Sequence, residues 1–185
     1  MAREALPEIL SCYLSRATNF LLLLPAIVFL CSQAYASNTE KQSINIEVTT
    51  HLGDKQKFKA GDKIAFLVSL DNDAHLLMIY EDAEHNLIQV IPNAYRKNSL
   101  YKKGLFIAVP DREEPFEFLV NSPFGSEKLW VFASSKQFPV LDGIPLKNGL
   151  KKLEKKLPEV LSAIRPAKPD ILFGQSSTVI TTETR

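Results

Sequence analysis

The chain has 185 residues, of which 45% are apolar and 23% are charged. This composition is ordinary for a globular protein, and the length suits one domain with an appendage. The formal net charge of +1 at pH 7 gives the chain no overall positive field that would attract nucleic acid or an anionic membrane. We therefore expect no nucleic-acid partner.

The first 36 residues resemble a secretory signal peptide. Arg16 precedes an apolar run from Phe20 to Leu30, and small residues follow at Ala34 and Ala36. A basic flank, an apolar core of roughly 7–15 residues and a small-x-small site define such a signal, and the run is shorter than the roughly 20 residues of a membrane-spanning helix. We predict cleavage after Ala36 and export to the periplasm. The alternative is an uncleaved signal that anchors the protein in the membrane.

Both cysteines of the chain, Cys12 and Cys31, fall inside this signal. Lipidation of Cys31 is not expected, because lipoprotein signals place a small residue before the cysteine and Leu30 stands there. The mature chain would then have no thiol, which removes disulfides, thiolate metal sites and thiol catalysis together.

Residues 37–185 form a single β-rich domain by their pattern. Apolar residues alternate with polar ones, or gather in short runs between turn residues, and this is typical of strands. The predicted strands cover residues 44–50, 63–70, 75–81, 87–91, 105–109, 116–120, 128–134 and 177–183. Short strands at regular intervals indicate an antiparallel, immunoglobulin-like β-sandwich or a small barrel.

A helical insertion is predicted over residues 146–164, before the last strand. Apolar residues recur there at three- and four-residue steps, with Pro158 either breaking the helix or starting a second one. The stripe consists of Leu146, Leu150, Leu153, Leu157, Leu161 and Ile164, and the lysines off it are Lys147, Lys151, Lys152, Lys155 and Lys156. The favoured interpretation is a helix that packs its leucines on the sheet and solvates its lysines. The alternative is a basic amphipathic helix that meets an anionic lipid or partner, and membrane contact is expected only there if at all.

No motif predicts a metal, a cofactor or catalysis. In "HLLMIYEDAEHNLIQVIPN" two strands flank a polar tip, the pattern of a β-hairpin. Asp82, Glu84 and His85 at that tip have neither zinc-site nor calcium-loop spacing. The S-x-x-K from Ser99 to Lys102 lacks the further elements of penicillin-recognising enzymes. We expect a non-catalytic protein, with an envelope hydrolase that uses Ser99 or a histidine as the least favoured alternative.

The stretches "FKAGDKIAFLVSLDNDAHLLMIYEDAEHNLIQVIPN" and "GLFIAVPDREEPFEFLVNSPFGSEKLWVFAS" resemble the bacterial family called domain of unknown function 4384, over about residues 57–135. The sequence departs from the family at His85, where glycine is common, and at "VIPN", where Phe usually precedes Pro-Asn. The matching positions are Gly61, Asp62, Asp82, Pro92, Asn93, Gly104, Pro110, Gly125 and Ser134. The resemblance implies a β-rich, often exported module that is fused to kinase-like, caspase-like and envelope-lipoprotein domains.

A module reused beside unrelated enzymes is expected to recognise or dock a partner, here another protein of the cell envelope. The candidate partner contacts are Asp82, Asn93, Tyr95, Arg96 and Tyr101, most of them in the stretch "PNAYRKNSLYKK", where tyrosine and arginine have the character enriched at interfaces. The alternative for this stretch is a long solvated connection. The alternative function is binding of a glycan or peptidoglycan fragment, which needs an exposed aromatic platform, whereas Trp130 lies in a strand pattern that favours the core.

Overall fold

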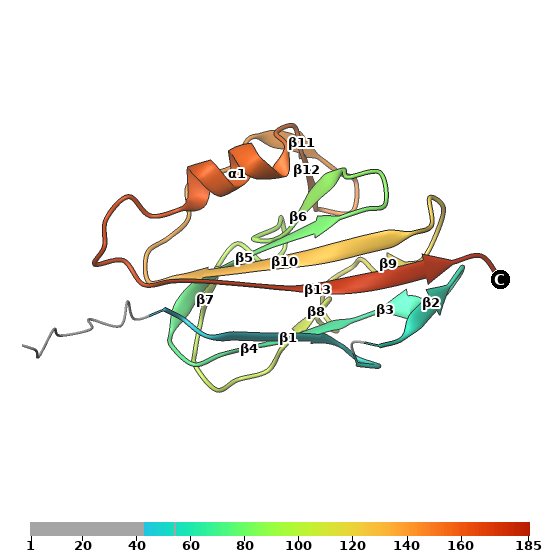
Figure 1. Ribbon diagram of the computed structural model, residues 1–185, viewed down its shortest axis with the longest axis horizontal. Coiled ribbons are helices and arrows are strands. Elements are labelled where there is room, and N and C mark those ends of the chain that lie inside the picture. Colours follow the sequence, from blue (N-terminus) through green and yellow to red (C-terminus); the bar gives the residue numbers. More distant parts are fainter. Residues whose placement is uncertain (1–42, 54) are drawn as a thin grey trace, which may run out of the picture. The chain divides into compact units, whose positions relative to one another are not determined.

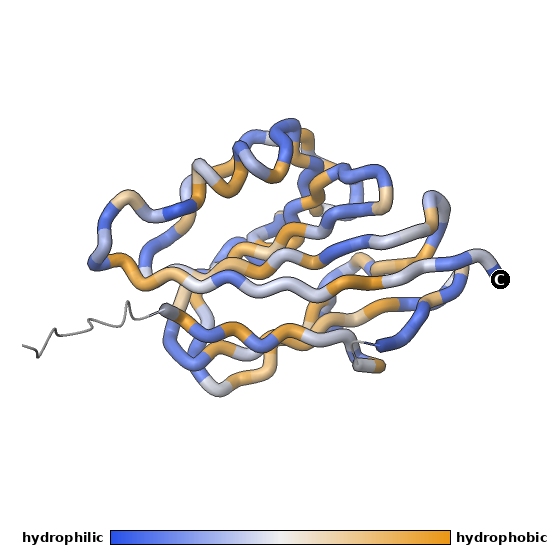
Figure 2. Tube along the Cα trace, viewed as in Figure 1, coloured by the Kyte–Doolittle hydropathy of each residue, from blue (hydrophilic) through white to orange (hydrophobic). Residues whose placement is uncertain are grey.

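The structure is a computed structural model that describes residues 43–53 and 55–185. The predicted signal peptide and its cleavage site lie outside the described residues. The strands form where hydrophobic and hydrophilic residues alternate. This alternation is visible along β1 (Ile46–Thr50) in Figure 2. Inward residues of each strand therefore meet in a common core.

Two main antiparallel sheets face each other. The small sheet has the order β1-β4-β8, with β4 at Phe66–Leu70 and β8 at Ile107–Val109. The large sheet has the order β11-β12-β6-β5-β10-β13-β2, and β7 pairs with β5. Among the strands of the described residues, only the β13–β2 pair is parallel. The bounds of the strands in the large sheet are β11 Gly143–Pro145, β12 Lys151–Leu153, β6 Leu87–Ile91, β5 Ala74–Glu81, β10 Ser126–Ser134, β13 Phe173–Glu183, β2 Lys57–Lys59 and β7 Leu100–Tyr101.

The large sheet is covered on both faces. The small sheet lies on one side of it and helix α1 (Leu157–Ile164) on the other (Figure 1). A short two-stranded sheet, β3 (Lys63–Ile64) with β9 (Phe118–Leu119), adds to the side of the small sheet. The described strands leave the sheets open, so the fold is a sandwich and the small-barrel alternative is wrong.

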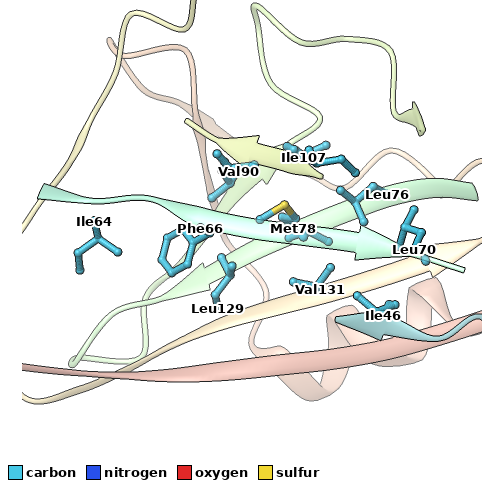
Figure 3. Packing of buried hydrophobic residues seen from close by; sticks show 14 of the residues in the cluster. Ile46, Ile64, Phe66, Leu70, Leu76, Met78, Val90, Ile107, Leu129 and Val131 are labelled. Atoms are coloured by element: carbon cyan, nitrogen blue, oxygen red, sulfur yellow. The ribbon is translucent and has the colours of Figure 1, made fainter. Parts of the chain in front are cut away.

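The main core fills the space between the two sheets. Phe66 of β4 and Met78 of β5 are fully buried there, beside Leu129 and Val131 of β10 (Figure 3). A second core lies under α1, where Leu77, Phe132 and Val160 meet among others. Each such side chain contributes roughly 1.5–3 kcal/mol by leaving water. The sequence of β5 is an unbroken apolar run because the side chains on its two faces pack into the two different cores.

The prediction of a helix over residues 146–164 is wrong for the first half of this range. Leu146 and Leu150 close a tight turn, with Leu146 N–H donating to the Leu150 carbonyl at 2.8 Å, and Gly149 adopts a φ of 81° that ends any helix. The β11–β12 hairpin occupies this segment, and α1 begins only at Leu157 with Pro158 in its first turn. The lysines thus lie outside the helix, and the Lys-rich membrane-binding helix does not form.

The last strand is longer than predicted, since β13 begins at Phe173 and pairs with β10 from there to Thr181. Gly174 and its polar neighbours have weak strand propensity, so the sequence pattern did not predict the first residues of β13. A Cβ at Gly174 would lie 2.0 Å from the Ile44 carbonyl oxygen, so glycine is required where β13 passes the chain before β1. Within the described part of the chain, no helix has the length and apolarity needed to cross a bilayer.

Candidate functional site

The tip of the β5–β6 hairpin is built around Asp82. One carboxylate oxygen of Asp82 accepts hydrogen bonds from the backbone N–H groups of Glu84 at 2.9 Å and Asn86 at 2.8 Å, and the other accepts one from the Asn86 side chain at 2.8 Å. His85 completes the turn with a φ of 64°, a conformation that favours glycine. Asp82 therefore organises the turn, and its contact with a partner stays a prediction.

A second network fixes the connection that follows β6. The Asn93 side-chain oxygen accepts the backbone N–H groups of Tyr95 at 2.9 Å and Arg96 at 2.7 Å, while its amide donates to Glu114 at 2.8 Å. The Arg96 guanidinium lies 3.1 Å from the same Glu114 carboxylate, whose side chain is only 5% exposed. Removing one partner of such a buried pair costs about 3–5 kcal/mol. Asn93 and Arg96 thus hold this connection in one conformation.

The two tyrosines of the connection differ in accessibility. Tyr95 is exposed, and its ring covers Gly149, where an added Cβ would approach the ring to 2.2 Å. Tyr101 is half-buried with its hydroxyl 3.5 Å from Arg96, and burial raises the pKa of Tyr101 despite that cation. Four of the five predicted contacts therefore share one connection, whereas Asp82 lies beyond the other end of β6.

The segment from β7 to the start of β8 carries three exposed apolar side chains, Leu100, Leu105 and Phe106, which we call the β7–β8 patch. Phe106 is 78% exposed, Leu105 is 59% exposed, and Leu100 is also exposed. The segment is tied down, because Gly104 N–H donates to the Leu70 carbonyl at 2.9 Å. Exposed apolar side chains on an anchored loop are typical of an interaction site.

Lysines and the predicted contacts border this patch. Lys97, Lys102 and Lys103 are exposed and close to the patch in the sequence, and the Lys102 ammonium lies 2.6 Å from Asp73. The Arg96 guanidinium also donates to the carbonyl of Ala108 at 3.4 Å. The rigid connection after β6 and the β7–β8 patch therefore meet at β8.

The inner face of β10 carries a buried carboxyl group, Glu127, which is 5% exposed. The Tyr80 hydroxyl donates to one of its oxygens, and the Thr182 hydroxyl donates to the other at 3.3 Å. Burial raises the pKa of Glu127, with a further contribution from the charge of Asp82, and outweighs both hydrogen bonds. Among residues 43–53 and 55–185, no lysine or arginine forms an ion pair with it. This carboxyl group therefore braces β5, β10 and β13 from inside.

Glu81, at the end of β5, points to the opposite face of the large sheet. Its carboxylate accepts a hydrogen bond from the Trp130 indole at 2.7 Å and lies 2.7 Å from the His85 ring nitrogen Nδ1. Burial raises the pKa of Glu81, but these two contacts outweigh it and lower the net value. The Lys128 ammonium stands 4.2 Å from the centre of the Trp130 ring, a cation–π contact. Trp130 is half-buried, so it serves neither wholly as core nor as an open platform.

The hydrolase alternative rests on Ser99, and the structure brings this residue to a histidine. The His75 ring nitrogen Nδ1 lies 3.0 Å from the buried Ser99 hydroxyl. Leu76 N–H donates to the Ser99 carbonyl at 2.8 Å, so the same residue also joins the connection after β6 to β5. These contacts position the chain, and catalysis by Ser99 stays an untested alternative. No cluster of three or more metal-binding side chains occurs in the part of the chain that the structure describes.

Sequence reasoning missed Glu127 and Glu114. For Glu127 a signal existed, because it continues the inward alternation of Leu129 and Val131, one residue before the predicted strand. For Glu114 no pattern existed, since its partner Arg96 is far away in the sequence. Long-range polar pairs of this kind become visible only in the fold.

The comparisons with known proteins bear on the family alone. Residues 57–137 match the family model described as Domain of unknown function (DUF4384), which confirms the resemblance drawn from the sequence. No curated protein and no solved structure is significantly similar to the chain. The match begins at β2 and ends after β10, so β1, the β11–β12 hairpin, α1 and β13 lie outside it. Because β13 pairs with both β10 and β2, the structural domain is larger than the matched segment.

Proposed function

Residues 57–137 belong to the DUF4384 family, and from this premise we propose that the chain is an exported, non-catalytic interaction module of the bacterial cell envelope that docks another envelope protein. The observation that carries the proposal is the β7–β8 patch, with Phe106 78% exposed on an anchored loop. Burying Leu105 and Phe106 against a partner would release roughly 1.5–3 kcal/mol for each side chain.

The chemistry of the patch supports a partner of one particular kind. Lys97, Lys102 and Lys103 are exposed and lie within three positions of Leu100 or Leu105 in the sequence, and of these only Lys102 forms an ion pair with another described residue. We infer a protein with an apolar pocket bordered by carboxylates. Such charges mainly steer the encounter and select the partner, while the apolar side chains provide most of the affinity.

Export is supported by the apolar run and small-x-small site of residues 1–36 and by a chain without cysteine after them. A periplasmic protein that needs no disulfide fits a domain of this size, whose core is large enough to fold without one. The alternative location is the membrane surface, through an uncleaved signal. Both locations place the β7–β8 patch within reach of envelope proteins.

Site-specific photo-cross-linking in intact cells tests the docking proposal. A photoreactive residue at position 105 is compared with one at position 52, because Leu105 and Leu52 are 59% and 56% exposed. Leu52 follows β1 near Ala65, at the end of β4 opposite Leu70 and the patch. We expect one discrete protein adduct from position 105, its loss on Phe106→Glu, and none from position 52.

Three results would overturn this proposal. The first is equal adducts from both positions, and the second is an adduct at 105 that survives Phe106→Glu. The third is cross-linking to phospholipid alone, which would make the patch a membrane contact. A Leu52→Glu variant serves as the control for added surface charge.

A further inference from the structure

A groove of about 800 Å³ separates the β5–β6 hairpin tip from the segment that leads into α1. Its volume falls within the range of about 300–1,000 Å³ found for small-ligand sites. The side chains of Leu87 and Leu153, buried in the core under α1, give it an apolar floor. Exposed Ile144 of β11 and half-buried Leu157 of α1 widen this apolar lining.

The two sides of the groove carry opposite charges. Glu81, Glu84 and His85 line it from the hairpin, and Lys152, Lys155 and Lys156 line it from the other side, together with Glu154. Among the described residues no ion pair joins the two sides: His85 pairs with Glu81 on its own side, and Lys155 lies 3.8 Å from Asp142. The groove is therefore polarised, and Glu84 on one side and Lys152 and Lys156 on the other form no ion pair with another described residue.

The hairpin side is preorganised. The three hydrogen bonds of Asp82 hold the tip, and the Glu81 carboxylate is fixed by the Trp130 indole at 2.7 Å. A side fixed before binding loses little conformational entropy when a ligand arrives. Trp130 is the single tryptophan of the chain, so its fluorescence reports directly on Glu81.

We propose that this groove binds short peptides that carry both a carboxylate and an ammonium group. The carboxylate pairs with Lys152 and Lys156, the ammonium pairs with Glu81 and Glu84, and the aliphatic part of the peptide lies on Leu87 and Leu153. Two sources supply such peptides to an exported protein, the cross-linking stems of the cell wall and the products of proteolysis.

This site is separate from the proposed docking surface. β7 and the patch that follows it lie at the Ala74 end of β5, because Leu100 pairs with His75, whereas Glu81 forms the other end of that strand. Failure of one proposal therefore leaves the other standing.

Fluorescence titration of the purified protein tests the groove. The probes are the wall stem tripeptide L-Ala-γ-D-Glu-meso-diaminopimelate and the linear tripeptide Ala-Glu-Lys, and the uncharged control is acetylated Ala-Gln-Met amide. We expect a saturable change of Trp130 emission with a charged probe and none with the control. Preference for the stem peptide would identify the wall as the source, and preference for the linear peptide would identify proteolytic products.

Charge variants assign the binding to the groove. Lys152→Glu combined with Lys156→Glu should weaken the Kd at least tenfold, and Glu84→Lys should do the same, while Lys147→Glu in the β11–β12 turn should have no effect. All four positions are exposed, so the fold should persist. Calorimetry repeats the titration independently of tryptophan emission. Absence of heat and emission change with both charged probes, or equal affinity in the Lys152/Lys156 and Lys147 variants, would overturn the proposal.

Discussion

Glu81 and Glu127 stand at the same end of the β5–β10 ladder but on opposite faces of the large sheet. Both side chains are largely buried, at 16% and 5% exposure, yet the pKa of Glu81 is lowered and that of Glu127 is raised. The hydrogen-bond donors and charges around each carboxyl group explain why the two pKa values move in opposite directions. Among the described residues, Glu127 accepts hydrogen bonds from two hydroxyl groups alone, whereas Glu81 meets an indole N–H, a histidine and the charge of Lys128. Surroundings, rather than depth alone, decide which carboxylate keeps its charge.

The comparison also separates structure from function. The inward carboxyl group closes a hydrogen-bond network between three strands and has no route to a ligand at 5% exposure. The outward one lines a groove and is held in its charged form. We therefore assign Glu127 to stability and Glu81 to the proposed binding site, and the two roles predict different responses to mutation.

The largest effect on the free energy of unfolding is expected from Glu127→Ala. Truncation leaves the Tyr80 and Thr182 hydroxyls without their acceptor and opens a space inside the sandwich, so we expect a loss of about 3 kcal/mol in the free energy of unfolding. Urea denaturation measures this loss. The control is Glu117→Ala, since the exposed Glu117–Lys63 pair should contribute no more than about 0.5 kcal/mol. A similar loss in both variants would refute the bracing role.

The next prediction concerns pH, and the two glutamates should respond with opposite signs. A raised pKa means that Glu127 stabilises the fold fully below its ordinary value of 4.5 and that this contribution is lost as pH rises through the folded-state pKa. Glu127→Gln removes this pH dependence. The free energy of unfolding of the variant should therefore rise relative to that of the wild type as pH increases above about 4.5.

For Glu81 the pKa is lowered, so its contribution is present above its ordinary value of 4.5 and is lost as pH falls through the folded-state pKa. Glu81→Gln should therefore be less stable than the wild type at neutral pH, and this deficit should shrink in acid. Urea denaturation across pH 3–8, at intervals of about one unit, measures both variants. Parallel curves for the two variants would contradict the comparison.

How much of this arrangement the sequence predicts depends on the range of the interactions. Local patterns suffice for the strands around β5 and β10 and for the hairpin tip, because alternation and turn residues act over a few positions. The β11–β12 hairpin escaped prediction because Leu146, Leu150 and Leu153 share helical spacing, while Gly149 decides otherwise. The groove escaped with it, since one of its sides is the segment that was expected to be helical. The buried Arg96–Glu114 pair and the Tyr80–Glu127 contact join distant residues, and no local pattern encodes them.

The smallest predicted effect belongs to Lys128→Met, which keeps an apolar stem over Trp130 but removes the ammonium. The cation–π contact at 4.2 Å lies at a partly exposed site, so we expect a loss of about 0.5 kcal/mol. The same change removes a positive charge near Glu81, so the pKa of that carboxyl should move back toward its ordinary value. NMR titration of the Glu81 side chain measures the pKa, with Lys147→Met as the control for loss of a surface lysine. An unchanged titration would mean that Trp130 and His85 alone keep Glu81 charged, and the lysine would then drop out of the comparison.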